Sequence, residues 1–212
     1  MSVTYREHIL PNGLRIAAEV DPKAVSAAAG FFVRSGARDE PTPLMGISHF
    51  LEHMVFKGTD ARGGEEIDEA FDELGVNHNA WTSHEITAFH VHGLPSTLEP
   101  ALCILADIMR PALRSNDLAD EAEVVVEEIA MYEDQPFWQL WERVSETYYG
   151  QHPMGHRVLG TADTVRAVSP ESMRSWHAER YGADNVVLAL AGQVDFDQTC
   201  TLVESLCGHW PQ

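Results

Sequence analysis

The sequence lacks the features of membrane, secreted and disulfide-linked proteins. It contains no apolar run near the ~18 residues that a membrane-spanning helix needs, so no membrane association is expected. Its first residues are too polar for a signal peptide, and we therefore expect a cytoplasmic location. The three cysteines, Cys103, Cys200 and Cys207, form no C-x-x-C pair. Their scatter and odd number argue against a disulfide framework.

Basic residues are also scarce. The 212-residue chain has 14 Lys and Arg against 33 Asp and Glu, which gives a formal net charge of −19. A surface of this sign repels the phosphate backbone, so no nucleic-acid partner is expected. It attracts basic partners, including peptides rich in Lys or Arg. Apolar residues make up 44% of the chain, which is enough for a packed globular core.

Apolar spacing and turn residues predict a mixture of strands and helices. Strands are expected at residues 3–10, 14–20, 25–35, 76–83, 86–92 and 185–191. Helices are expected at residues 44–57, 64–74, 95–109, 116–132, 137–149, 170–181 and 195–208. Because the two kinds of element do not alternate strictly, the pattern favours an α+β fold over a doubly wound parallel sheet.

The strongest chemical signal lies in the first predicted helix, in the run His49-Phe50-Leu51-Glu52-His53. Residues four apart share a face of a helix, and the residue three along lies beside them. Both imidazoles and the Glu52 carboxylate therefore point the same way. Two histidines in this arrangement can each give one nitrogen to a zinc ion. A carboxylate next to them can take a proton from the zinc-bound water, which then attacks a peptide carbonyl.

A catalytic zinc ion needs a third protein ligand, and the acidic helix at residues 116–132 offers candidates. Glu121 and Glu128 are two turns apart and project from one side of that helix. Glu127 lies about 100° around the helix from Glu128. One of these acids can serve as a ligand while another supports a ligand histidine, because ligating histidines usually need a partner for their second nitrogen.

Several motifs together resemble one family of peptidases. The order H-x-x-E-H is the inverted zinc motif, and the chain is similar to the pitrilysin and mitochondrial processing peptidase family over essentially its whole length. The residues that carry the resemblance are 10–14 (LPNGL), 46–54 (GISHFLEHM), 56–59 (FKGT), 79–82 (NAWT), 124–129 (VVVEEI), 152–155 (HPMG), 159–161 (LGT), Tyr181 and Asn185.

The resemblance implies a fold and an activity. The fold would be an α+β domain with a mostly antiparallel sheet covered by helices. The activity would be that of a zinc metalloendopeptidase with one zinc ion per chain. His49 and His53 would bind the metal, and Glu52 would be the general base. The third ligand would be Glu128, which closes the V-V-x-E-E pattern, and the acid that supports a ligand histidine would be Glu121.

The resemblance also implies how substrate binds. The strand at 79–82 would be an edge strand that pairs with the peptide backbone, which places Asn79 and Ala80 beside the scissile bond. The expectation has a physical basis, since an exposed edge strand offers backbone groups to which an extended peptide can add. Backbone pairing of this kind discriminates little between peptide sequences. Selectivity must then come from side-chain pockets.

Members of the resembled family are usually built from two or four similar domains. Residues 1–212 are expected to form a single zinc-peptidase domain, equivalent to the family's N-terminal catalytic domain, without the second domain. In the family, the second half contributes an Arg and a Tyr that help to bind substrate and stabilise the oxyanion. We therefore expect a second homologous domain or chain, or a homodimer, as partner.

Two other functions remain as alternatives. The chain can be a non-catalytic or scaffold subunit of a peptidase complex, although such subunits typically lose the zinc motif. It can also be a metalloenzyme similar to S-ribosylhomocysteine lyase, which carries an H-x-x-E-H helix and a further cysteine ligand. Cys103 is the cysteine in a comparable region, but its apolar surroundings are typical of a core position. Glu127 remains an alternative to Glu128 as third ligand.

Overall fold

A computed structural model describes residues 2–212 of the chain, which form six strands and eight α-helices with short 3-10 turns between them. The strands are β1 (Thr4–Ile9), β2 (Arg15–Val20), β3 (Ala27–Val33), β4 (Asn77–Thr82), β5 (Thr87–Gly93) and β6 (Val186–Gly192). The helices are α1 (Ile47–Val55), α2 (Gly64–Leu74), α3 (Leu98–Ile108), α4 (Ser115–Glu133), α5 (Pro136–Tyr149), α6 (Ala162–Arg166), α7 (Pro170–Arg180) and α8 (Phe196–Cys207).

The six strands form one twisted sheet in the order β1-β2-β6-β3-β5-β4. Strands β2 and β6 run parallel, and the other four neighbouring pairs are antiparallel. This arrangement confirms the predicted α+β fold with a mostly antiparallel sheet. Strand β4 lies at one end of the sheet, next to β5, so it is an edge strand as expected.

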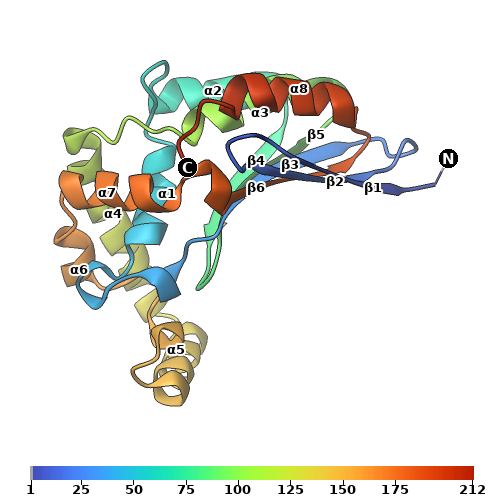
Figure 1. The fold of residues 1–212 in the computed structure, drawn as a ribbon. Helices are drawn as coiled ribbons and strands as arrows, with labels where there is room; N and C mark the ends of the chain where they lie inside the picture. Colours follow the sequence, from blue (N-terminus) through green and yellow to red (C-terminus); the bar gives the residue numbers. More distant parts are fainter. Residues whose placement is uncertain (1) are drawn as a thin grey trace.

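Helices α1, α3 and α8 contact the sheet. Figure 1 shows α2, α3 and α8 together over one of its faces. The helices bury the side chains that point to this face. Burial therefore alternates along a strand, because successive residues point to opposite faces. On β3, for example, Phe31 and Val33 are fully buried, whereas Phe32 between them is partly exposed. Buried apolar side chains from both ends of the chain belong to one core cluster.

The structure corrects two predicted boundaries and adds a helix. The helix expected at residues 44–57 begins only at Ile47, because Gly46 before it has a left-handed backbone conformation with φ +91°. A Cβ atom at Gly46 would lie 2.5 Å from the carbonyl oxygen of Leu159, so only glycine fits there. The helix expected at 95–109 begins at Leu98, after a 3-10 turn. Helix α6 was not predicted.

Helix α5 projects away from the rest of the molecule (Figure 1). It contains no buried residue, although it is rich in aromatic side chains. No helix within residues 2–212 is long and apolar enough to cross a membrane.

Candidate metal centre

The position of α1 is set from outside the helix. Its first turn has no side-chain cap of its own. Instead, the Glu40 carboxylate accepts hydrogen bonds from the backbone N–H groups of Gly46 (2.7 Å) and Ser48 (2.8 Å). Glu40 is only 3% exposed, and burial raises its pKa to about 7. A buried acid from a preceding loop therefore satisfies free N–H groups at the start of the helix that carries the zinc motif.

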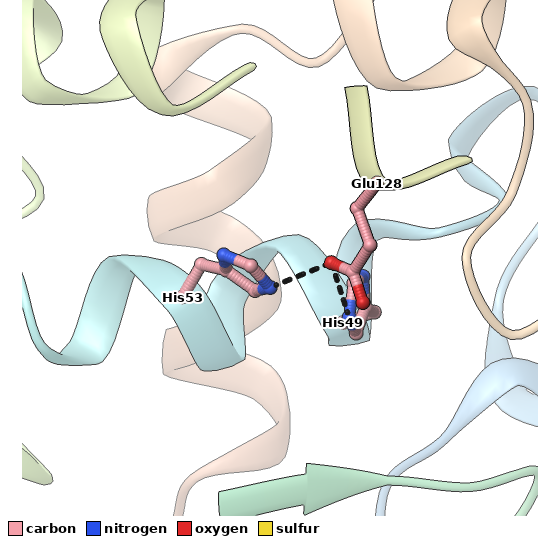
Figure 2. Close-up of side chains that lie close together, drawn as sticks. All are labelled: His49, His53 and Glu128. Carbon is pink, nitrogen blue, oxygen red and sulfur yellow. Dashed lines mark ion pairs between the residues drawn. The ribbon is translucent and has the colours of Figure 1, made fainter. Parts of the chain in front are cut away.

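His49 and His53 project from α1 toward Glu128 on α4 (Figure 2). The Oε2 atom of Glu128 lies 3.5 Å from His49 Nε2 and 3.3 Å from His53 Nε2. One potential ligand atom from each residue lies within 4.8 Å of the other two. Two atoms bound to one tetrahedral zinc ion at about 2.1 Å lie about 3.4 Å apart, so these separations fit a shared metal.

Glu121 lies on the far side of His53 from Glu128. Its Oε1 atom is 2.9 Å from His53 Nδ1, and its other oxygen pairs with the Lys57 ammonium group. With Nδ1 donating to Glu121, His53 keeps Nε2 directed at Glu128. Burial alone would raise the pKa of Glu121, but its bonds to His53 and Lys57 outweigh burial and lower it. Glu121 therefore contacts the ring nitrogen of His53 that does not face Glu128.

The two histidines have opposite pKa shifts. Burial lowers the pKa of His49 to about 4, helped by the neighbouring charge of His53. Burial also opposes protonation of His53, but its bonds to Glu121 and Glu128 outweigh this and raise its pKa to about 9. At neutral pH His49 is therefore a neutral imidazole, as a metal ligand must be. A metal that binds His53 displaces the proton from Nε2.

Glu52 lies on the same side of α1 and lines one cavity with His49 and Glu128. Its Oε2 atom accepts a hydrogen bond of 2.5 Å from the Thr82 hydroxyl group on β4. Burial raises the pKa of Glu52. The carboxylate is therefore a stronger base than an exposed glutamate, and it sits beside the two candidate ligands.

The predicted substrate residues lie on the edge strand with different orientations. Ala80 lines the cavity, whereas Asn79 is exposed on the alternate face of β4. The side-chain oxygen of Asn79 accepts a hydrogen bond of 2.9 Å from the backbone N–H of Ala80. That N–H group therefore points away from β5 and is available to an added strand once Asn79 moves aside.

Neither of the two alternative ligands, Glu127 and Cys103, lies within the group of candidate metal ligands. Glu127 is exposed on α4, one residue from Glu128 but directed away from the histidines. Cys103 lies in α3, and within residues 2–212 no cysteine belongs to a cluster of potential metal ligands. The geometry therefore favours Glu128 as the third ligand and gives no support to a lyase-like cysteine site.

Residues outside the sequence motifs also line the cavity, which has a volume of about 350 Å³. Helix α5 contributes Trp138, Trp141 and Glu142, and Arg157 follows from the loop beyond it. Arg157 pairs with Glu142 at 3.4 Å. A sequence signal did exist, because the helix predicted at residues 137–149 carries two tryptophans three residues apart. Thr82 was quoted within a motif, but its contact with Glu52 needs the fold.

Comparisons with known proteins identify relatives of the chain. The sequence profile described as Insulinase (Peptidase family M16) matches residues 15–162, and the profile described as Peptidase M16 inactive domain matches residues 167–212. An uncharacterized zinc protease of Mycobacterium leprae is 38% identical over 200 residues, which cover 94% of this chain and 45% of that protein. The uncharacterized zinc protease YmxG of Bacillus subtilis is 38% identical over 190 residues, which cover 89% and 46%.

Solved structures show the same fold. A protease from Helicobacter pylori superposes with a TM-score of 0.95 at 23% identity, over 100% of this chain and 52% of that one. Pitrilysin superposes with a TM-score of 0.88 at 22% identity, over 100% of this chain and 23% of that one. The chain thus spans about half the length of the curated relatives that it matches.

Proposed function

Because the chain belongs to the insulinase family of peptidases, family M16, we propose that it is the metal-binding, catalytic domain of a zinc metallopeptidase. The observation that carries the proposal is the convergence of two imidazole nitrogens on one Glu128 oxygen, at 3.5 and 3.3 Å. In this proposal His49, His53 and Glu128 hold one zinc ion, and Glu121 fixes the orientation of His53.

Glu52 is the proposed general base. When bound, zinc supplies Lewis-acid activation of a water molecule and of the peptide carbonyl group. Glu52 accepts the proton that the attacking water loses and returns it to the leaving amine nitrogen. Burial raises the pKa of Glu52, which makes the carboxylate a stronger base for the first of these steps.

We propose that substrate binds as a strand added to β4. A peptide carbonyl oxygen would take the place of the Asn79 oxygen on the Ala80 N–H group. This exchange would bring the peptide backbone alongside the cavity that holds Glu52. Side chains of the peptide would then meet Trp138 and Trp141. The net charge of −19 favours basic peptides among those that can bind.

We propose that the chain forms a single domain that acts together with a second domain. The exposed edge of β4 and the exposed helix α5 both border the cavity. A second homologous domain or chain would exclude water from that cavity and so strengthen the charge interactions within it. A homodimer would repeat each contact across a two-fold axis. Light scattering on the chain, alone and with a candidate second half, distinguishes these assemblies.

The test of the proposed function combines metal content with the loss of the base. Glu52→Gln keeps the shape of the side chain but cannot accept a proton. We expect the variant to retain about one zinc per chain and to lose at least ~100-fold in kcat on a quenched fluorescent peptide. Both are measured in the assembly that shows activity, with Glu69→Gln on the exposed face of α2 as the matched control. Wild-type cleavage by Glu52→Gln would rule out Glu52 as the base.

A further inference from the structure

The carboxylate of Glu52 is held from one direction. Among the hydrogen bonds within residues 2–212, the bond from the Thr82 hydroxyl group to Oε2, 2.5 Å long, is the one that this carboxylate receives. The other oxygen, Oε1, has no such bond from the described part of the chain. The two oxygens of the base are therefore unequal, because one is fixed and one remains to take up a proton.

The Thr82 side chain is itself firmly placed. Thr82 pairs with Thr87 across the β4–β5 ladder, and the Thr87 hydroxyl group donates to the buried carbonyl of Ser35 at 2.9 Å. The next residue, Ser83, donates its N–H to the Ile86 carbonyl at 2.8 Å and closes the turn. A β-branched side chain has few accessible χ1 rotamers. The hydroxyl group is therefore a fixed point from which the more flexible Glu52 side chain can be oriented.

Thr82 belongs to the strand that is proposed to receive the peptide. Residues two apart on a strand point to the same face, so Thr82 and Ala80 face α1 together. Both line the cavity with Glu52. Strand β4 therefore carries both Ala80, whose backbone would pair with the substrate, and Thr82, whose hydroxyl group contacts the base. The two residues are two positions apart on one strand.

We propose that Thr82 is a positioning residue for the base, one that sets the direction of the Glu52 carboxylate relative to a peptide bound on β4. The inference rests on the proposed function, because it needs Glu52 to act as a base. With Oε2 held by Thr82, Oε1 is directed at the attacking water. Without the hydroxyl group, Glu52 rotates among its χ3 orientations, and the productive one is occupied for a smaller fraction of the time.

The test uses variants that differ mainly in the hydroxyl group. Thr82→Val keeps the branched shape and removes the donor, whereas Thr82→Ser keeps the donor. Because the hydrogen bond that is lost is made to a charged group, we expect Thr82→Val to lower kcat at least ~10-fold. KM should change less than ~2-fold, because Thr82→Val removes a contact with Glu52 and leaves the backbone of β4 unchanged. Thr82→Ser should restore most of kcat, and zinc content should stay at wild-type level in both variants. Thr201→Val, at an exposed position on α8, is the control.

A double-mutant cycle adds a second readout. On the Glu52→Gln background, Thr82→Val should cost less than ~2-fold in residual kcat. The urea midpoints of the four zinc-free chains should likewise be non-additive, because the amide oxygen of Glu52→Gln accepts only a weaker, uncharged hydrogen bond from Thr82. If Thr82→Val does not fold, the pair Thr82→Ala and Thr82→Ser carries the same comparison.

The outcomes separate the two proposals. Wild-type kcat in Thr82→Val, in a protein that Glu52→Gln inactivates, would leave Glu52 as the base and overturn the role of Thr82. An equal loss in Thr82→Val and Thr82→Ser would also overturn it, since the donor would then not matter. Full activity of Glu52→Gln would instead overturn the proposed function, and the inference about Thr82 with it.

Discussion

Helices α1 and α5 border the same cavity but differ in what surrounds them. Seven of the nine residues of α1 are buried, and a buried carboxylate from outside the helix caps its first turn. Helix α5 has fourteen residues, none of them buried, and it projects from the molecule in Figure 1. Arg157 ties it to the following loop through Glu146 at 2.9 Å and Glu142 at 3.4 Å, and these ion pairs are partly exposed.

The difference in burial between α1 and α5 places the candidate metal ligands and the aromatic side chains of the cavity on elements with unequal support. The proposed metal ligands and the proposed base sit on elements that the chain's own core holds in place, so their geometry does not depend on a partner. The aromatic wall of the cavity sits on a helix with little support, so its position can respond to a peptide or to a second domain. We therefore propose that metal binding is a property of this chain and that peptide selection depends on what contacts α5.

The largest expected effect comes from removing one aromatic ring from each helix. Phe50 on α1 is 0% exposed, and Phe137 on α5 is 72% exposed. Phe50→Ala should lower the free energy of unfolding by about 3–5 kcal/mol because it leaves a cavity in the core. Phe137→Ala should change it by less than about 0.5 kcal/mol. Urea unfolding followed by circular dichroism measures both, and equal losses would remove the contrast between the helices.

A smaller effect concerns the cap of α1 and has a defined pH dependence. The folded-state pKa of Glu40, about 7, lies above its ordinary value of 4.5. The folded state therefore binds the Glu40 proton more tightly than the unfolded state does. The stability that this binding contributes is lost as pH rises from about 4.5 to 7. Relative to Glu40→Gln, which cannot titrate, wild type should lose up to about 3 kcal/mol of stability across that window. A constant difference between the two proteins from pH 4.5 to 7 would contradict the assignment.

The smallest effect distinguishes the two sides of α5. Trp141 lines the cavity and Leu140 does not, although both are similarly exposed, at 59% and 61%. Trp141→Ala should raise KM for peptides about 5-fold, because a partly buried side-chain contact contributes about 1 kcal/mol. Leu140→Ala should change KM less than ~2-fold, and neither variant should alter zinc content. Equal KM values for the two variants would show that α5 does not contact the peptide.

Much of the metal centre could be predicted from the sequence because its spacing is local. His49, Glu52 and His53 share a helix face by the 3.6-residue period, and Glu121 and Glu128 share another. The pairing of Glu121 with His53 and of Glu128 with both histidines follows once the two helices meet. Choosing Glu128 over Glu127 needed the family resemblance, since adjacent residues differ by only about 100°.

Other features depend on contacts between distant segments. Helix α1 begins after Gly46, where the close approach of Leu159, more than 100 residues away, leaves no room for a side chain. The parallel pairing of β2 with β6 joins the two ends of the chain and leaves no local signal. The bond between Thr82 and Glu52 likewise needs the fold. The exposure of α5 could not be read from its composition, because an aromatic helix predicts burial.

The metal content of matched glutamine variants tests the central claim most directly. Glu128 and Glu127 are neighbours on α4, but the first faces the histidines and the second is exposed. Atomic emission on dialysed protein should find about one zinc per chain in wild type and in Glu127→Gln, and a clear loss in Glu128→Gln. Equal zinc in wild type and Glu128→Gln, or a loss confined to Glu127→Gln, would contradict the assignment of His49, His53 and Glu128 as the metal site.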